Sequence, residues 1–224
     1  MQSDSTEVIV TRSLLTLLVL PGLGLLYWFP IRRWYRYWGA TRAEIERDMP
    51  GDAEVPRAIY ETTLAVTVDA PPADIWPWLV QLGYRRGGLY SYDWLDRLFG
   101  FLDAPSAEAI LPEFQQLAVG DVIPVGRGAG FPVSALEPFR ALVLSGESEG
   151  FRWTWQFGLY PIDERRTRLV SRNRARMART AGSTLFMCLL EPAAFIMTRR
   201  MLLGLKRRAE TTGAQQHDAA KPAA

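Results

Sequence analysis

The side chains best suited to acid–base chemistry in this sequence cluster on either side of a Gly-Gly pair. They are Arg85, Arg86, Tyr90, Tyr92 and Asp93. Tyrosine, arginine and aspartate can together supply general acid–base catalysis without histidine. A second carboxylate, Asp96, shares a helix face with Asp93 by its spacing. The same residue types also form structural hydrogen-bond and salt-bridge clusters, so both interpretations stay open.

The scarcity of histidine and cysteine excludes several classes of enzyme. The chain has one cysteine, Cys188, and one histidine, His217, which lies in a polar C-terminal stretch. A Ser-His-Asp triad, a Cys-His pair and a His-based zinc site are therefore excluded from the folded part, as is an internal disulfide. We assign no catalytic residue on this basis, and we expect no metal and no cofactor.

Length, composition and charge are those of an ordinary globular protein. The 224 residues suffice for one domain with a sizeable core and an appendage. Apolar residues make up 48% and charged residues 22%, which argues against a disordered chain. The net charge is only +2 and no recognition motif accompanies the arginines, so we expect no binding to nucleic acid.

An uncharged, leucine-rich run covers residues 13–31. As a helix, a run of this length spans roughly 28 Å, close to the thickness of the hydrocarbon core of a bilayer. Arg32, Arg33 and Arg36 follow the run and only Arg12 precedes it, which places the rest of the chain on the cytoplasmic side. We predict a single-pass membrane protein whose folded domain is cytoplasmic. The alternative is a hydrophobic helix that packs on a partner.

The remaining chain predicts a strand, two helices, five further strands and a long terminal helix. The strands are residues 58–68, 121–125, 131–137, 140–145, 151–160 and 166–177. The first helix starts at Asp69-Ala70-Pro71-Pro72, and the last covers 184–210 with a bend or break at Glu191-Pro192. Six twisted strands curl, and the terminal helix is the element that can close their concave face.

Five segments follow from these patterns. They are a polar N-terminus (1–12), the anchor (13–31), a juxtamembrane segment and linker (32–57), a folded domain (58–211) and a disordered tail (212–224). The linker is indicated by the proline, glycine and aspartate residues of its second half.

Three stretches of the folded domain share features with a known superfamily. They are Asp69-Ala70-Pro71-Pro72-Ala73-Asp74-Ile75-Trp76-Pro77-Trp78-Leu79, Gly87-Gly88-Leu89-Tyr90-Ser91-Tyr92-Asp93-Trp94-Leu95 and Met197-Thr198-Arg199-Arg200-Met201-Leu202-Leu203-Gly204. The chain thereby resembles the START-like polyketide cyclases/dehydratases and lipid-transfer proteins (SRPBCC), most of all uncharacterised bacterial members, over roughly residues 55–210. The resemblance implies an α+β helix-grip fold: a curved antiparallel sheet around a long C-terminal helix, with an apolar cavity between them. It supplies no shared catalytic motif and no ligand.

Two apolar faces are candidates for the walls of that cavity. Trp153, Trp155 and Phe157 alternate along one face of a predicted strand. Met197 and Met201 share a face of the terminal helix, and methionine adapts to irregular apolar shapes. Core packing explains both faces, and a cavity wall is the functional alternative.

Arginines occupy one face of the last predicted strand, at Arg168, Arg172, Arg174 and Arg176. If they point outward, they form a solvated or headgroup-facing surface. If they point inward, Arg172 is placed to bind an anionic head group through its planar pair of donors.

These observations give one leading hypothesis and two alternatives. The first is membrane-tethered binding of a lipid-like or aromatic small molecule in an internal cavity. The alternatives are a cyclase/dehydratase-like enzyme acting on a polyketide-type substrate, and a membrane-surface scaffold module; the sequence sets no oligomeric state. The predicted ligand-binding residues are Tyr90, Tyr92, Asp93, Trp153, Trp155, Phe157, Arg172, Met197 and Met201.

Overall fold

The computed structural model describes residues 19, 22, 24 and 27–219, and the chain divides into two compact units. The first unit is residues 1–36 and the second is residues 37–224. In the first unit, a π-helical turn η1 (Tyr27–Ile31) leads into a short helix α2 (Arg32–Arg36). The hydroxyls of Tyr27 and Tyr35 lie 2.9 Å apart and form a hydrogen bond between these two elements.

The prediction of a single-pass membrane protein is contradicted. In the part of the chain that the structure describes, no helix is both long enough and apolar enough to cross a bilayer. Much of the predicted 13–31 anchor lies outside the described residues, as does the predicted polar N-terminus. The described end of the anchor is the π-helical turn, which contains Pro30 and is followed at once by arginines. Proline removes a backbone donor and π-helical turns are short irregularities, so this end does not continue a regular apolar helix.

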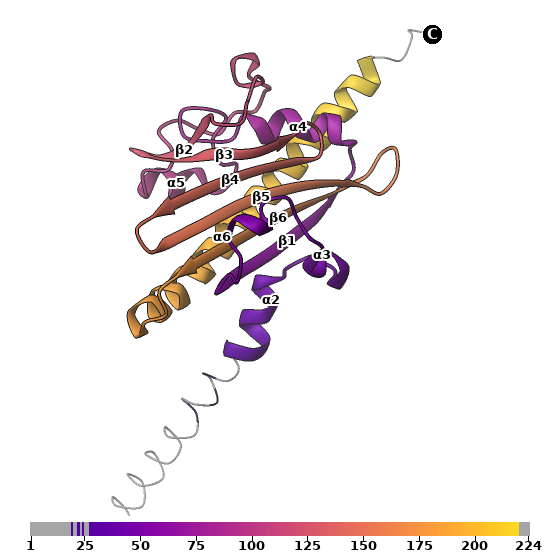
Figure 1. The fold of residues 1–224 in the computed structure, drawn as a ribbon. Helices are drawn as coiled ribbons and strands as arrows, with labels where there is room; N and C mark the ends of the chain where they lie inside the picture. The colour runs from indigo at the N-terminus through magenta and orange to yellow at the C-terminus, as the bar shows by residue number, and fades with distance from the viewer. Residues whose placement is uncertain (1–18, 20–21, 23, 25–26, 220–224) are drawn as a thin grey trace, which may run out of the picture. The chain divides into compact units, whose positions relative to one another are not determined.

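A six-stranded antiparallel sheet is the main element of the second unit (Figure 1). Its strand order is β1-β6-β5-β4-β3-β2, so the first strand pairs with the last and all other neighbours are consecutive. The strands are β1 (Tyr60–Val68), β2 (Val122–Gly126), β3 (Ala129–Glu137), β4 (Ala141–Ser148), β5 (Phe151–Pro161) and β6 (Thr167–Met177). All six predicted strands are therefore present.

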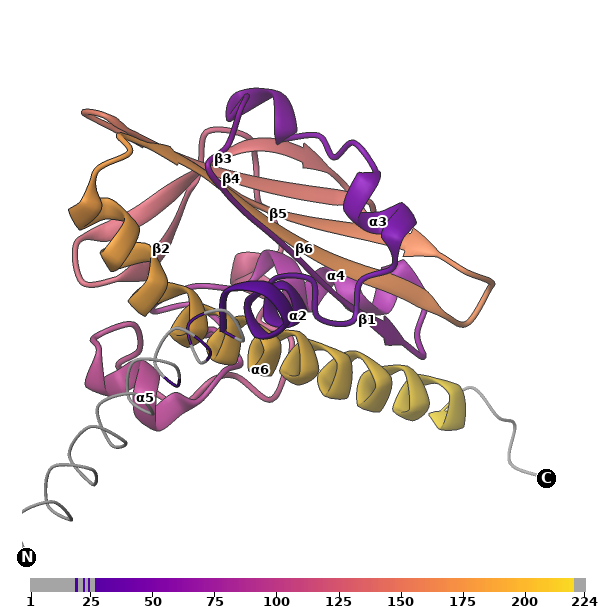
Figure 2. The ribbon, with the colours of Figure 1, turned by 90° about the horizontal axis from the view of Figure 1, so that it is seen from below.

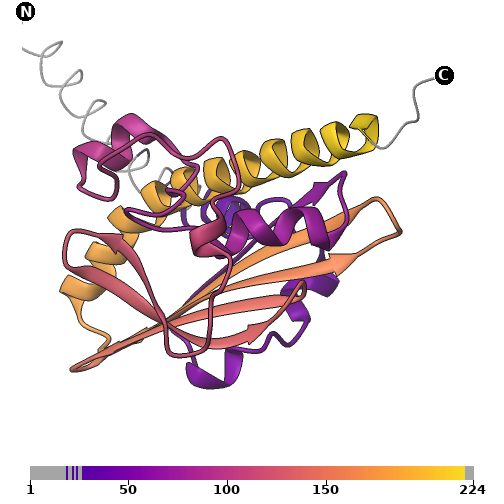
Figure 3. The same ribbon diagram turned by 90° about the horizontal axis from the view of Figure 1, so that it is seen from above.

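The helices α4 and α6 cover one face of this sheet (Figures 2 and 3). Helix α4 (Pro72–Val80) follows β1, and α5 (Asp93–Leu98) and the short η3 (Pro112–Phe114) follow it. Helix α6 (Ala181–Ala219) packs against α4 and β1. It stays helical through Pro192, and its first part runs at an angle to the rest, as Figure 2 shows.

The C-terminal end of α6 differs from the sequence prediction. Residues 212–219 continue the helix and are not the predicted disordered tail, while 220–224 lie outside the described residues. The hydroxyls of Thr211 and Thr212 donate to the carbonyls of Arg207 and Arg208, one turn earlier. These local bonds add to an unbroken helical backbone that has no proline in this stretch.

The hydrophobic core fills one end of the covered face. Leu64, Val66 and Val68 of β1 pack with Leu169 of β6 and with the second half of α6, including Leu205. The register pairs these strand segments, with Val66 opposite Leu169. Because the core takes only this end of the sheet, the other ends of β1, β5 and β6 face the first half of α6.

Residues 41–57, predicted to be a linker, pack against the opposite face of the sheet. This segment contains α3 (Arg42–Glu46) and η2 (Asp52–Glu54), and Figures 1 and 2 show α3 on the side away from α6. The backbone N–H of Gly51 donates to Gln156 of β5 at 2.9 Å. Ser134 of β3 donates to Glu54 at 2.7 Å, so the segment reaches across several strands.

The buried guanidinium of Arg172 holds this segment in place. Its side chain is 2% exposed and donates to Asp52 Oδ2 at 2.6 Å. It also donates to the backbone carbonyls of Glu44, Ile45 and Arg47. Side chains alternate between faces along a strand, and the inward positions of β6 belong to other residues. Arg172 was predicted to bind the ligand, but it points away from the covered face and binds the chain's own backbone.

Candidate ligand-binding site

A cavity of about 400 Å³ lies between the open end of the sheet and the first half of α6. The strands β1, β5 and β6 supply one wall, and the turns of α6 from Phe186 to Met201 supply the other. The loop before α5 contributes Leu89 and Ser91, and the loop after it contributes Phe101. The helix-grip arrangement thus leaves a hollow where the core packing ends.

The lining is almost entirely apolar. No Asp, Glu, Lys or Arg is among the described residues that line the cavity. The polar side chains in its walls are Tyr60, Thr62, Ser91, Asn173 and Thr198. Such a surface suits an uncharged, hydrophobic group, with few positions at which a ligand could form hydrogen bonds.

A series of aromatic rings forms the floor of the cavity. The Phe131 and Trp153 ring centroids lie 4.3 Å apart, and those of Trp153 and Trp155 lie 6.0 Å apart. The indole N–H of Trp155 donates to Ser171 Oγ at 3.0 Å. Because its polar atom is already satisfied by the sheet, the Trp155 ring is left as apolar surface for a ligand.

The structure brings four of the predicted site residues to this cavity. Trp153, Trp155, Met197 and Met201 all line it. Phe157 does not: it is 0% exposed and belongs to the core, with its ring 5.0 Å from that of Trp155. The alternation along β5 therefore places the right face inward, but the cavity ends before Phe157.

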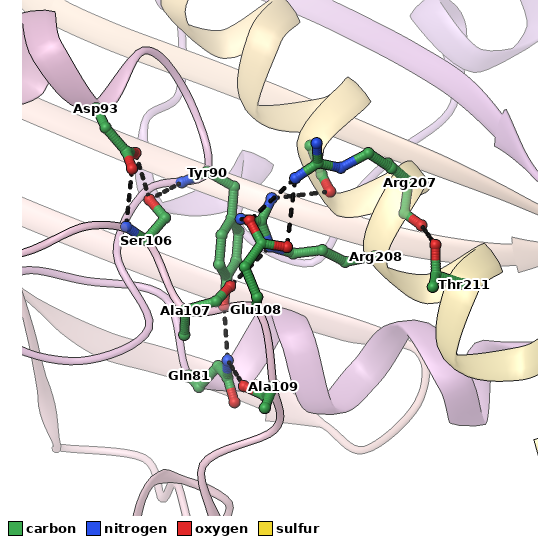
Figure 4. Close-up of polar contacts among 11 residues, drawn as sticks. Gln81, Tyr90, Asp93, Ser106, Ala107, Glu108, Ala109, Arg207, Arg208 and Thr211 are labelled. Carbon is green, nitrogen blue, oxygen red and sulfur yellow. Dashed lines mark hydrogen bonds and ion pairs between the residues drawn. The ribbon is translucent and has the colours of Figure 1, made fainter. Parts of the chain in front are cut away.

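Tyr90 is buried and performs a structural role (Figure 4). Gln81 Nε2 donates to its hydroxyl at 2.9 Å, and the Arg208 guanidinium lies 4.5 Å from its ring centroid. Burial raises the pKa of the Tyr90 hydroxyl above its ordinary value, so the group stays protonated. Its backbone adopts a left-handed conformation with φ of 55°. These contacts fix the loop before α5.

Tyr92 and Asp93 line a second hollow, which we call the arginine groove. It measures about 410 Å³ and borders α5 and the middle of α6. Its charged side chains are Asp93, Arg97, Glu108, Arg200, Arg207 and Arg208. Asp93 accepts from the backbone N–H of Ser106 at 2.9 Å and from its hydroxyl at 2.7 Å, as Figure 4 shows. The Asp93 carboxylate is thus engaged in holding a loop.

The two arginines before the glycine pair do not join this group. Arg85 pairs with Asp103 at 3.0 Å on the surface. Arg86 donates to the carbonyls of Val80 and Leu82 at the end of α4. The residues around the glycine pair are therefore divided among separate structural contacts and do not form one acid–base cluster.

Asp96 is a buried carboxyl that was not among the predicted ligand-binding residues. It is 0% exposed, and Ser91 Oγ donates to its Oδ2 at 2.5 Å. Its Oδ1 has no hydrogen-bond partner among the described residues. Burial raises the pKa of Asp96, the nearby Asp93 raises it further, and the Ser91 hydrogen bond opposes both. Since Ser91 lines the cavity, this buried acid is hydrogen-bonded to a residue of the cavity wall.

The only sequence signal for Asp96 is its three-residue spacing from Asp93, which puts both on one helix face. That spacing does not reveal burial, because burial depends on tertiary packing. Among the residues that the structure describes, no three His, Cys, Asp or Glu side chains gather as metal ligands.

The chain was compared with protein families, curated proteins and solved structures. No protein-family model matches the sequence, and no curated protein matches it. The chain is similar to the Zhui aromatase/cyclase from Streptomyces sp. R1128, at 16% identity over 73% of this chain and 99% of that one, with a TM-score of 0.36. It is similar to the Polyketide_cyc-like protein Cgl2372 from Corynebacterium glutamicum, at 14% identity over 74% and 99%, with a TM-score of 0.35. CalU16 from Micromonospora echinospora gives 17% identity over 70% and 88%, with a TM-score of 0.33.

This chain has a START-like, helix-grip fold. The assignment rests on the chain's own topology: six antiparallel strands in the order β1-β6-β5-β4-β3-β2, with the terminal helix α6 across one face. The α+β helix-grip fold predicted from the sequence is confirmed, and the START-like resemblance is confirmed for the fold alone.

Proposed function

We propose that this protein binds an apolar small molecule, lipid-like or aromatic, in the cavity between the sheet and the first half of α6. The observation that carries the proposal is the cavity's lining, which has aromatic and aliphatic walls and no charged side chain among its described residues. A hollow of about 400 Å³ is within the range of small-molecule sites. An empty apolar hollow forfeits packing contacts, and a ligand restores them.

The nature of the walls supports a ligand that varies in shape. Met197 and Met201 lie on consecutive turns of α6 and face the rings of β5 across the cavity. Methionine side chains adjust to irregular apolar surfaces, whereas the tryptophans offer flat, rigid ones. A molecule with an aliphatic or fused-ring body is complementary to this pair of walls.

Binding of a neutral fluorescent dye tests the proposal. We expect N-phenyl-1-naphthylamine to fluoresce on binding the full chain and to quench Trp153 and Trp155. Ala194→Phe places a ring inside the cavity, because Ala194 lines it. Ala193→Phe is the matched control, because Ala193 is the preceding residue on α6 and is exposed.

The expected result is weakened dye binding in the Ala194 variant and unchanged binding in the Ala193 variant. Native mass spectrometry of the purified chain should also release a bound apolar compound. Equal dye binding by both variants would overturn the proposal, because the dye would then be on another surface.

A cyclase/dehydratase-like activity is a second candidate, and the Ser91–Asp96 pair favours it. A cyclodehydration needs one proton delivered to a leaving hydroxyl and one removed from the adjacent carbon. The Asp96 carboxyl can do both in turn by relaying each proton through Ser91 Oγ, which it contacts at 2.5 Å. Its raised pKa suits the role of an acid that is protonated before the reaction.

Turnover of a linear poly-β-ketone separates this candidate from a carrier. Asp96→Asn should abolish product formation while leaving dye binding intact. Asp48→Asn is the control, since Asp48 is exposed and does not line the cavity. If the wild-type chain binds the substrate and returns it unchanged, the enzymatic candidate is wrong and simple binding remains.

A further inference from the structure

The arginine groove and the apolar cavity are neighbours, and one residue belongs to both. Ser91 lines each of them. The same stretch of α6 also lines both hollows. Met197 and Met201 line the cavity, and Arg200 and Gly204 line the groove. A molecule that passes Ser91 therefore goes from an uncharged environment to a strongly basic one.

The groove has two more arginines than carboxylates. Glu108 is already engaged, with its carboxylate 3.0 Å from Arg207 and 2.6 Å from Arg208. The Asp93 carboxylate is engaged by Ser106. Neither acidic group is left to neutralise the remaining arginines.

Arg97 and Arg200 carry the uncompensated charge. Arg97 donates to the backbone carbonyl of Asp93, and the Arg200 guanidinium lies 5.5 Å from the Tyr92 ring centroid. Neither pairs with a carboxylate among the described residues, and both side chains are solvent-accessible. Guanidinium groups held at one hollow without acidic partners are ready donors for carboxylate or phosphate oxygens.

At the floor of the groove, α6 packs closely against the Tyr90 loop. Arg208 is 6% exposed and lies against the Tyr90 ring, with its guanidinium donating to the carbonyl of Ala107 at 2.8 Å (Figure 4). Gly204 faces the Tyr90 carbonyl, where any Cβ would overlap the oxygen. The positions of Arg200 and Arg207 relative to α5 are therefore set by a rigid contact.

We propose that the arginine groove binds the anionic headgroup of an amphipathic ligand whose apolar part occupies the cavity. The headgroup chemistry is a carboxylate or a phosphate, recognised by Arg97 and Arg200. This inference rests on the proposed function, since it assigns the polar end of the same ligand. It also accounts for the uncharged lining of the cavity, because the charge of the ligand lies outside it.

Three probes with one alkyl chain test the assignment. Dodecanoate and dodecylamine, each below its critical micelle concentration, and dodecanol, below its solubility limit, compete with N-phenyl-1-naphthylamine for the full chain. We expect dodecanoate to displace the dye at concentrations on the order of tenfold lower than dodecanol does, which is the scale of one charge-assisted hydrogen bond. Dodecylamine should be the weakest competitor.

The double variant Arg97→Gln/Arg200→Gln should remove the advantage of dodecanoate and leave dodecanol unchanged. Arg165→Gln is the control for the loss of charge, since Arg165 lies on the exposed turn between β5 and β6. Equal potency of dodecanoate and dodecanol on the wild-type chain overturns the headgroup assignment but leaves the cavity proposal standing. Failure of all three probes to displace the dye overturns the cavity proposal itself.

Inorganic phosphate distinguishes a headgroup from a free anion. If phosphate alone binds with the same dependence on Arg97 and Arg200, while dodecanoate competes no better than dodecanol, the groove takes free anions and the amphipathic assignment is wrong. If phosphate weakens dodecanoate binding and leaves dodecanol binding unaffected, the headgroup occupies the groove as proposed.

Discussion

The hydroxyl of Ser91 and the carboxyl of Asp96 form a 2.5 Å hydrogen bond that joins a buried acid to the wall of an apolar cavity. Ser91 lines the cavity, and the Asp96 carboxyl bonded to it is shielded from solvent. Burial raises the pKa of Asp96, so the folded chain holds this proton more firmly than the unfolded chain does. The pair gives an uncharged pocket one group that can exchange a proton.

The first prediction concerns the stability cost of ionising Asp96. Because its folded-state pKa is raised, stability falls as the pH rises from the unfolded-state value of about 3.9 through the folded-state value. Asp96→Asn removes this penalty, and we expect it to stabilise the protein at pH 7. Urea unfolding from pH 4 to pH 8 measures it, with Asp48→Asn on the exposed surface as control. A variant that is less stable than wild type at every pH contradicts the prediction.

The second prediction concerns Arg172 and the segment it holds. Arg172→Met leaves the Asp52 carboxylate and three backbone carbonyls without their buried donor. Breaking a buried ion pair in this way costs about 3–5 kcal/mol, and chemical denaturation should show it. Arg140→Met, in an exposed pair with Glu137, should cost less than about 1 kcal/mol. A small effect at Arg172 would mean that residues 41–57 pack without its help.

These contacts show which parts of the structure follow from sequence patterns. Period-2 alternation correctly places Trp153 and Trp155 on one face of β5, and turn residues and helical periodicity identify each strand and α6. The packing of residues 41–57 on β6 was missed because its contacts join positions more than one hundred residues apart in the chain. Composition makes such a segment look like a linker, since its order comes from Arg172 and not from its own propensity.

The site residues also divide into those that sequence periodicity predicts and those that tertiary packing decides. The residues of regular elements were found by their periodicity, as with Met197 and Met201. The direction of Arg172 stayed open in the sequence, because an alternating strand has two faces and only tertiary packing selects one. Asp96 was noted for its spacing from Asp93 but was not predicted to be a site residue, because the six residues of α5 are too few for a helical period to reveal which side is buried.

The third prediction is that the protein loses stability in acid because of two carboxyls, Glu44 and Asp52, on the face of the sheet opposite α6. Burial disfavours ionised Glu44 and Asp52, but hydrogen bonds and arginine charges outweigh it and hold the pKa of each carboxyl below its ordinary value. For a lowered pKa, the stabilisation is present above the unfolded-state values of about 4.3 and 3.9 and is lost as the pH falls through the folded-state values. This dependence has the opposite sign to that of Asp96.

The double variant Glu44→Gln/Asp52→Asn should therefore be less stable than wild type at pH 7 and should lose less stability between pH 5 and pH 2. Thermal unfolding at each pH measures both effects. Glu46→Gln, whose carboxylate pairs with Arg42 on the surface, serves as control and should leave the wild-type profile unchanged. Parallel acid profiles for the double variant and the wild type would exclude these two carboxyls as the source.

The fourth prediction tests the close approach of α6 to the Tyr90 loop. Glycine inside a helix normally costs up to about 1 kcal/mol relative to alanine, so a change to alanine is stabilising where space exists. At Gly204 no space exists, because the added Cβ would overlap the Tyr90 carbonyl oxygen, a backbone atom that cannot swing away. We expect Gly204→Ala to destabilise the protein by about 1–3 kcal/mol, the usual cost of overpacking.

Gly182 provides the matched control on the same helix. The nearest atom that its added Cβ would meet is Thr180 Oγ1 at 3.8 Å, which is an ordinary contact. Gly182→Ala should therefore leave stability unchanged or raise it slightly, and thermal unfolding of both variants compares them directly. Because the Gly204 contact positions Arg200 relative to α5, its variant should also reduce the preference for dodecanoate over dodecanol. If Gly204→Ala instead stabilises the protein as Gly182→Ala does, α6 does not lie against the Tyr90 backbone and the groove lacks the rigid floor on which its arginines depend.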